Sequence, residues 1–348
     1  MDKRAEILAA ARERILIKDG PYGTAIQRAK LGEEGYRGDF DLELDQKGNN
    51  DLVNLTQPAL IRTICDSYID AGAHVLATNT FNANRISQAD YGAEHLVHDI
   101  NVAAARIIRD AADEATAKDG IPRFVAGAMG PTNKTLSLSP DVEDPGFREV
   151  TFDQIKQVYR EQAAALIEGG ADVILIETVF DTLNCKSAIM AVRELADETG
   201  RDIPLMISMT LTDLSGRNLS GHTVEAFWNA VRHADPVAIG LNCSFGADQL
   251  RPHVQLLSGI ADALLLAYPN AGLPNELGEY DEEPETTARL ITPWAEHRRV
   301  NILGGCCGST PEHIAAMARA VADHEPRDIP EAEPVMRLAG LEAYEIAS

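Results

Sequence analysis

The chain contains eight short apolar runs that alternate with segments of helical periodicity. The periodicity is clear before the fourth run, where Ile155, Tyr159, Gln162 and Leu166 fall on one helical face. Strands that alternate with helices are typical of βα units around a parallel sheet. Eight such units favour an α/β fold, the (β/α)8 TIM barrel, over an open doubly wound sheet. The predicted strands are Arg14–Lys18, His74–Thr78, Arg123–Ala128, Val173–Glu177, Pro204–Met209, Val237–Leu241, Ala263–Ala267 and Val300–Leu303.

One barrel accounts for most of the 348 residues. We expect the barrel to cover residues 1–325, and the Pro- and Glu-rich composition of residues 326–348 predicts a linker tail. A long insertion from roughly Ala25 to Asn54 separates the first two predicted strands and is rich in Gly and charge. It is either a lid or rim over the barrel mouth or an ordinary surface excursion.

Polar motifs follow seven of the eight predicted strands. Barrels of this type bind their substrates at the C-terminal ends of the strands, so these motifs predict an active site there. Glu177 and Asp181 follow the fourth strand and could bind a substrate ammonium group, although Asp181 also suits a helix N-cap. The motifs are Asp19–Thr24, Thr78–Phe81, Gly130–Asn133, Glu177–Asp181, Asn242–Ser244, Pro269–Pro274 and Gly305–Gly308.

Three cysteines stand at two of these strand ends. Cys306 and Cys307 are adjacent and flanked by glycines, and Cys243 follows the sixth strand. Three thiolates with one open position are typical of a catalytic zinc site. A strained vicinal disulfide is the alternative for the adjacent pair, whereas Cys65 and Cys185 fit buried positions on helices.

The composition limits the class of partner. A net charge of −23 would repel nucleic acid and anionic membranes, so we expect neither as a partner. The N-terminal residues lack the form of a signal peptide, and no apolar run approaches membrane-spanning length. Five cysteines without disulfide-like spacing suit a reducing compartment, and we expect a cytoplasmic protein.

From about Ile15 to Val321 the strand-end motifs together resemble the zinc-dependent homocysteine S-methyltransferases. The resemblance is greatest to the homocysteine-binding module of cobalamin-dependent methionine synthases. Two positions depart from that pattern: Pro21-Tyr22 in the first loop, and Tyr268 where the pattern usually has His. The most specific motifs are Thr78–Phe81, Gly130–Thr132, Glu177–Asn184, Gly240–Cys243, Pro269–Pro274 and Gly304–Gly308.

The resemblance implies two groups of functional residues. Zinc would be bound by Cys243, Cys306 and Cys307, with the amide oxygen of Asn270 as a candidate fourth ligand in the substrate-free enzyme. The amino-acid end of homocysteine would be held by Asp19, Gly20 and Glu177, with Asn79 as a further candidate.

The resemblance also implies a reaction, the methylation of the homocysteine thiol to give methionine. A free thiol has a pKa near ~8.5, and coordination to zinc would keep the substrate sulfur deprotonated. The expected donor is methylcobalamin carried by another domain or chain, and the expected partners are the cobalamin- and folate-binding parts of methionine synthase. The alternatives are a stand-alone enzyme that uses S-methylmethionine or betaine, and a non-catalytic zinc-binding subunit.

Overall fold

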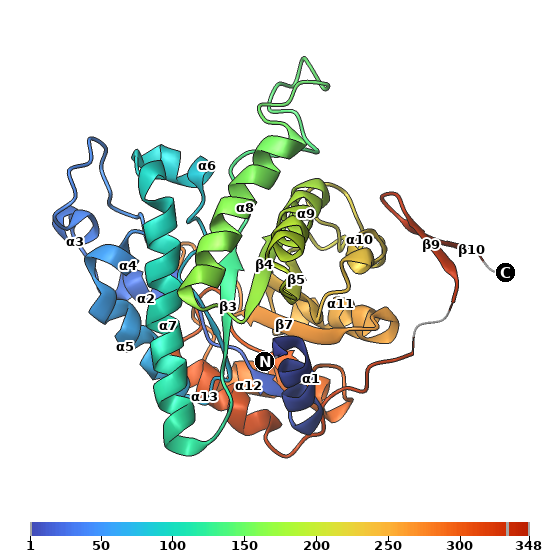
Figure 1. Ribbon diagram of the computed structural model, residues 1–348. Coiled ribbons are helices and arrows are strands. Elements are labelled where there is room, and N and C mark those ends of the chain that lie inside the picture. Colours follow the sequence, from blue (N-terminus) through green and yellow to red (C-terminus); the bar gives the residue numbers. More distant parts are fainter. Residues whose placement is uncertain (1, 332–333, 347–348) are drawn as a thin grey trace.

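The computed structural model describes residues 2–331 and 334–346, and within them eight parallel strands form one sheet in the order β1-β8-β7-β6-β5-β4-β3-β2 (Figure 1). Backbone hydrogen bonds from His74 N to Ile17 O (2.6 Å) and from Asp19 N to Val75 O (3.0 Å) join the two edges. The sheet is therefore a barrel, as predicted. The strands are β1 (Leu16–Ile17), β2 (Val75–Ala77), β3 (Phe124–Met129), β4 (Val173–Val179), β5 (Leu205–Met209), β6 (Ala238–Gly246), β7 (Leu264–Asn270) and β8 (Ile302–Leu303).

Helices surround the barrel, and several begin at the signals that their sequences carry. Thr310 caps the last barrel helix with Pro311 in its first turn, and Asp181 caps the helix after β4. The long helices are α1 (Lys3–Glu13), α5 (Pro58–Asp70), α7 (Val97–Asp119), α8 (Phe152–Gly169), α9 (Thr182–Thr199), α10 (Val224–Val231), α11 (Ala247–Ile260), α12 (Pro284–Glu296) and α13 (Pro311–Val321). The short ones are α2 (Tyr22–Arg28), α3 (Glu33–Arg37), α4 (Val53–Thr56), α6 (Arg85–Gln88), η1 (Ala89–Tyr91), η2 (Glu94–Leu96) and η3 (Arg232–Ala234).

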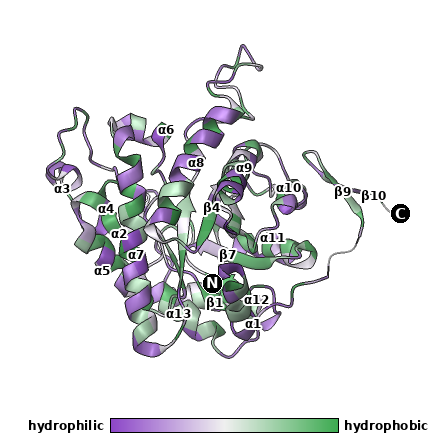
Figure 2. Cartoon of the chain, viewed as in Figure 1, coloured by the Kyte–Doolittle hydropathy of each residue, from purple (hydrophilic) through white to green (hydrophobic). Residues whose placement is uncertain are grey.

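The core has an inner and an outer layer. Inward-facing residues such as Leu16, Phe124 and Leu266 fill the barrel, and Ile7 of α1 packs against this inner cluster. A second, larger cluster lies between the strands and the surrounding helices. Figure 2 shows hydrophobic residues on β4 and β7 and hydrophilic stretches on α7 and α8, as expected for strands buried on both faces.

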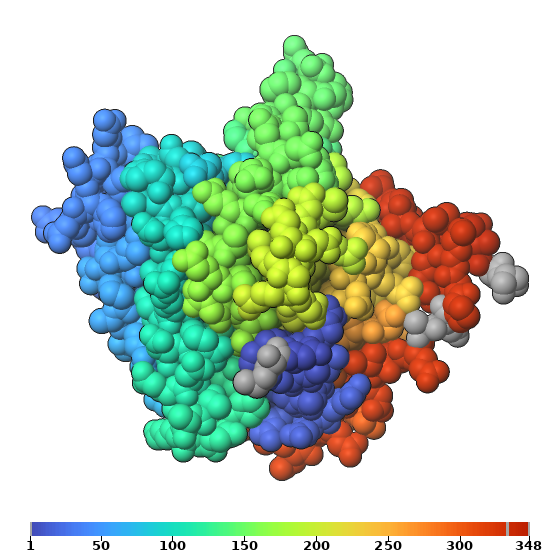
Figure 3. Space-filling view, in the orientation of Figure 1, coloured from blue at the N-terminus to red at the C-terminus, as the bar shows by residue number. Residues whose placement is uncertain are grey.

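Two excursions rise at the C-terminal ends of the strands. The predicted insertion from Ala25 to Asn54 contains the end of α2, all of α3 and the start of α4. Glu33 joins two parts of the insertion by accepting from the backbone N–H groups of Gln46 and Lys47. The connection from β3 to α8, residues 130–151, was not predicted as an insertion, yet it projects from the body of the molecule (Figures 1 and 3). Its polar, Pro-containing sequence shows no helical or strand period, so the sequence did not indicate how far it would project.

The predicted linker tail carries structure. Arg327 is buried beneath the barrel and donates to the backbone oxygens of Ser258, Ala261 and Ala263. The hairpin β9 (Met336–Ala339) and β10 (Ala343–Ile346) packs beside α10. The composition of this segment did not indicate its structure, because the contacts that order it are made with distant parts of the chain. No helix in the described part of the chain is long and apolar enough to cross a membrane.

Candidate metal and substrate site

The three predicted cysteines converge at the barrel mouth. Cys243 lies on β6, Cys306 and Cys307 follow β8, and their sulfur atoms all lie within 4.8 Å of one another. The Sγ atoms of Cys243 and Cys307 are 3.9 Å apart. A tetrahedral ion with Zn–S bonds near 2.3 Å holds two sulfurs about 3.8 Å apart. The cluster therefore has the spacing that one zinc ion requires.

A local distortion of β6 orients Cys243. The register between β6 and β7 shifts between Asn242 and Gly246, and Cys243 and Ser244 have φ values of 60° and 63°. Non-glycine residues rarely adopt this left-handed conformation, which costs energy and is common at functional sites. The distortion is held by Asn242, whose side chain hydrogen-bonds to Thr178 and Ser208.

Strand β7 supports the loop that carries the other two cysteines. Cys306 N donates to Pro269 O (2.8 Å), and Ala271 N donates to Cys307 O (2.9 Å). Asn270, between these two contacts, is only 3% exposed, and its Oδ1 has no hydrogen-bond partner within the described residues. A buried amide oxygen normally has a partner. Its unsatisfied state beside the cysteine loop fits the predicted fourth ligand.

The cluster cannot hold three thiolates without a cation. Hydrogen bonds from Cys243, Cys306 and Tyr280 lower the pKa of Cys307 to about 3, whereas the pKa of Cys306 is raised by its hydrogen bonds with the other two thiols and by burial. One thiol thus ionises at the expense of its neighbours, because like charges at this distance repel. A divalent metal removes this conflict, and the donor set fits zinc.

A cavity of about 300 Å3 opens beside the cysteines, and three of the four predicted substrate residues line it. Gly20 leaves room for Tyr68, since a Cβ there would lie 2.6 Å from the Tyr68 ring. Asn79 uses its side-chain N–H to tie the rim together, donating to Asn50 O (2.7 Å). Asp19, the fourth, is fully buried next to the cavity. The third predicted residue in the lining is Glu177, and the remaining lining includes Lys18, Asp51, Thr178 and Tyr268.

A network of charged and polar side chains lies under the cavity. Tyr268, at the position where the related pattern has His, donates to Glu177 Oε2 (2.9 Å). Lys18 donates to Asp19 Oδ1 (2.9 Å), and Asp19 Oδ2 accepts from Ala77 N. Burial raises the pKa of Glu177, and the nearby Lys18 ammonium opposes that rise. The network can therefore bind a ligand with charges of both signs.

Asp51 brings a buried carboxyl group to the rim of the cavity. Its Oδ1 accepts from Asn82 N (3.0 Å), which ties the insertion to the loop after β2. Burial raises the pKa of Asp51 to about 7.

We expect Asp51→Asn to stabilise the protein increasingly as the pH rises from about 4 to about 7. Unfolded aspartate titrates near ~3.9, so in this interval the folded protein holds a proton that the unfolded chain has lost, and wild-type stability falls with rising pH. Asn keeps the acceptor for Asn82 N and has no charge to bury. The gain above pH 7 is at most roughly 4 kcal/mol. Urea denaturation at pH 5 and pH 8 measures this gain. If the free energy of unfolding differed between variant and wild type by the same amount at both pH values, the raised pKa of Asp51 would be contradicted.

Several residues of the site were not identified from the sequence. Lys18 was included in an apolar run, although a charge at the end of a buried strand could have indicated a role. Asn242 was noted only as part of a motif. Nothing in the sequence indicated that its side chain would form hydrogen bonds with two other strands. Tyr280 reaches Cys307 from the long loop after β7. Asp51 was treated only as part of the insertion.

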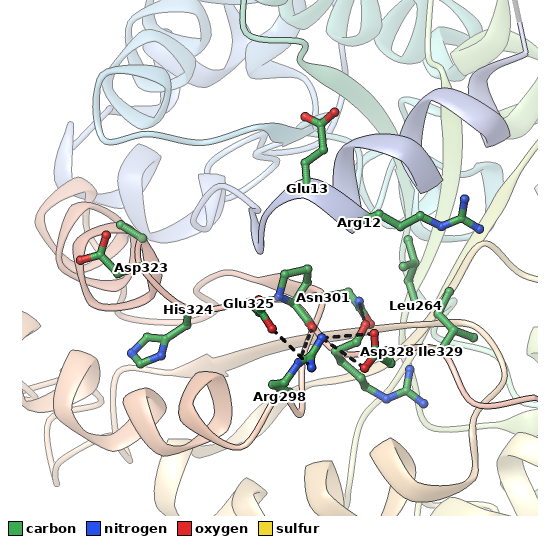
Figure 4. A pocket seen from close by; sticks show the side chains of 13 residues that line it. Arg12, Glu13, Leu264, Arg298, Asn301, Asp323, His324, Glu325, Asp328 and Ile329 are labelled. Carbon is green, nitrogen blue, oxygen red and sulfur yellow. Dashed lines mark hydrogen bonds and ion pairs between the residues drawn. The ribbon is translucent and has the colours of Figure 1, made fainter.

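A second cavity, of about 640 Å3, lies at the opposite, N-terminal end of the barrel (Figure 4). Glu13, Leu264 and Asn301 line it just before or at the start of β1, β7 and β8. Arg298, one of three arginines in its lining, pairs with Glu325 and Asp328. Barrels of this kind bind their substrates at the C-terminal ends of the strands, so the cavity beside the cysteines is the candidate active site.

Comparisons with known proteins agree with this geometry. The family model of homocysteine S-methyltransferase matches residues 16–321. The metallated form of the homocysteine methyltransferase MmuM from Escherichia coli is 23% identical, with a TM-score of 0.70 over 91% of this chain and 99% of that chain. Its oxidized form, also 23% identical, gives 0.67 over 88% and 95%. At this identity the structural likeness concerns the barrel fold. The family match spans every strand of the barrel, and the chain belongs to the homocysteine S-methyltransferase family.

Proposed function

We propose that this protein transfers a methyl group to the thiol of homocysteine at a zinc ion. The observation that carries the proposal is the convergence of Cys243, Cys306 and Cys307 beside a cavity that also contains buried charged groups. A metal site alone would suit a structural role, but structural zinc sites are closed by four protein ligands. Three thiols next to a cavity leave a position for a substrate sulfur.

The residues around the cavity have separate roles in this proposal. Cys243, Cys306 and Cys307 would bind the metal, and Asn270 would complete the set before substrate enters. Zinc bound there would supply a Lewis acid that keeps the substrate thiol deprotonated at neutral pH. Glu177 would accept a hydrogen bond from the substrate ammonium group, while Tyr268 holds the Glu177 carboxylate in place. Gly20 and Asn79 would shape the pocket. Asp19, buried next to the pocket, would help to hold the amino-acid end of the substrate.

The proposed methyl donor is methylcobalamin carried by a separate domain or chain. A corrinoid is too large for a cavity of about 300 Å3, so it would have to approach from outside the mouth. Large apolar side chains are exposed there: Val142, Leu214 and Leu277, in the loops after β3, β5 and β7, are 95%, 76% and 83% exposed. A cobalamin-carrying domain docked over the mouth would cover such side chains.

A small donor is the alternative, and Asp51 favours it. S-methylmethionine carries a sulfonium centre and betaine a quaternary ammonium centre, and the Asp51 carboxyl group lines the same cavity. Its raised pKa leaves this group only partly ionised near pH 7, which weakens its attraction for a cation.

An activity assay with parallel donors tests the proposal. The zinc-loaded chain is supplied with homocysteine and with free methylcobalamin, a methylcobalamin-loaded domain, S-methylmethionine or betaine. We expect slow methionine formation from free methylcobalamin and faster formation from the loaded domain. Efficient turnover with S-methylmethionine or betaine, and none with methylcobalamin, would show that the methyl donor is a small molecule and not methylcobalamin. No product with any donor, together with no binding of homocysteine, would instead indicate a non-catalytic zinc protein.

A further inference from the structure

Lys18 places an ammonium group inside the barrel beside the candidate substrate cavity. It follows β1, where Leu16 faces the interior and Ile17 faces the helices, so the alternation of a strand turns Lys18 inward. The side chain is 4% exposed and lines the cavity. Lysine is rarely buried without a specific partner, so this position needs an explanation.

The surrounding residues make room for this side chain. A Cβ on Gly304, on the neighbouring β8 side, would lie 2.8 Å from Lys18 Cβ, so a larger residue there would displace it. The Lys18 Nζ lies 4.7 Å from the centre of the Tyr268 ring, within the range of a cation–π contact. Gly304 and Tyr268 thus hold Lys18 in a defined place.

The ammonium group stays charged and keeps hydrogen-bonding capacity. Burial lowers the pKa of Lys18, but the carboxylates of Asp19 and Glu177 outweigh this and raise it overall. An ammonium group has three N–H donors. Within the described residues the structure records one hydrogen bond from Lys18 Nζ, the bond to Asp19. The second oxygen of Asp19 is occupied by Ala77 N, which leaves this carboxylate fixed against Lys18.

Homocysteine requires a partner for each of its three polar ends. Its sulfur would meet the cysteine cluster and its ammonium group a carboxylate. Its own carboxylate would be buried in the cavity, which is costly without a donor or a cation. Among the described residues that line the cavity, Lys18 is the cation, and Glu177 lies close enough to contribute to its pKa. The two groups can therefore hold the two ends of one α-amino acid.

We propose that Lys18 is a specificity-determining residue that binds the α-carboxylate of the substrate while Glu177 binds its ammonium group. This inference rests on the proposed function. Asp19 is then a positioning residue, which acts on the substrate through Lys18. The site would prefer thiols that carry both charged groups over thiols that lack the carboxylate.

Three thiols in which the third carbon from the sulfur bears the charged groups separate these roles. Homocysteine carries both groups, 3-aminopropane-1-thiol lacks the carboxylate, and 4-sulfanylbutanoate lacks the ammonium group. Calorimetric titration of the zinc-loaded protein measures the affinity for each. We expect wild type to bind 3-aminopropane-1-thiol roughly 10- to 100-fold more weakly than homocysteine, the range for a lost hydrogen bond to a charged group.

Lys18→Met should remove this preference. Homocysteine and 4-sulfanylbutanoate should lose roughly 10- to 100-fold in affinity, and 3-aminopropane-1-thiol should keep its affinity. Glu177→Gln is the matched control, since it should weaken the two thiols that carry an ammonium group and spare 4-sulfanylbutanoate. Because Lys18→Met leaves Asp19 buried without its partner, Lys18→Met/Asp19→Asn serves as a second variant.

The outcomes distinguish this inference from the proposed function. Equal affinity of wild type for homocysteine and 3-aminopropane-1-thiol would overturn the role of Lys18 without any variant, while the thiol-binding function would stand. If the folded Lys18 variants lost the same affinity for all three thiols, the proposed role of Lys18 would also be overturned, since a merely structural lysine would have that effect. If no thiol binds to the zinc-loaded wild type, the proposed function itself fails.

Discussion

Cys306→Ala is expected to abolish both zinc binding and methyl transfer to homocysteine. The three cysteine sulfurs lie within 4.8 Å of one another, and the remaining two cannot complete a site that depends on three thiolates. The variant should still fold, because Cys306 lies at the C-terminal face of the barrel. Residues at that face serve catalysis, whereas residues at the opposite face serve stability. Zinc content by atomic emission should fall from about one ion per chain to a small fraction of that.

Cys185→Ala is the matched control for this variant. Cys185 is also a free thiol, but it is buried on α9 in the outer core. We expect it to keep its zinc and its activity, with some loss of stability from the smaller side chain. If Cys306→Ala kept full zinc and activity, the assignment of the metal ligands would be wrong. Circular dichroism of both variants separates loss of metal from loss of fold.

Gly240→Ala is expected to prevent stable folding. Gly240 pairs with Leu266 in the register of β6 and β7, and a Cβ on it would lie 2.0 Å from the Leu266 carbonyl oxygen. The obstructing atom belongs to the backbone of a central strand, which cannot move aside as a flexible side chain can. We expect a loss of roughly 4 kcal/mol or more in the free energy of unfolding, or no soluble protein.

Gly259→Ala provides the comparison. Gly259 lies in α11 with nothing within 4 Å of an added Cβ, so alanine should be neutral or stabilise by about 0.5–1 kcal/mol. Urea denaturation midpoints of the two variants measure the difference. A Gly240→Ala protein with the midpoint of wild type would show that β6 and β7 can separate without cost.

The local pattern of the sequence was enough to identify the barrel and to group three cysteines as candidate metal ligands. Each predicted strand contains or overlaps an observed one, because parallel strands buried on both faces need continuous apolar runs. Cys243, Cys306 and Cys307 could be grouped because the C-terminal ends of the strands in a barrel all meet at one face.

Only the tertiary structure revealed how the site is supported. Asn242 spans three strands, and the amide oxygen of Asn270 is unsatisfied beside the cysteine loop. At the start of the tail, Arg327 reaches carbonyl oxygens more than sixty residues away in the chain.

Lys18 illustrates the physical reason. It follows the apolar residues Leu16 and Ile17, and its charge is stabilised by the adjacent Asp19 together with Tyr268 and Glu177, which barrel closure brings beside it. Apolar periodicity and glycine-flanked cysteines act over a few residues and can be read along the chain. The energy of a buried charge depends on groups from distant strands, and their arrangement is decided only when the barrel closes.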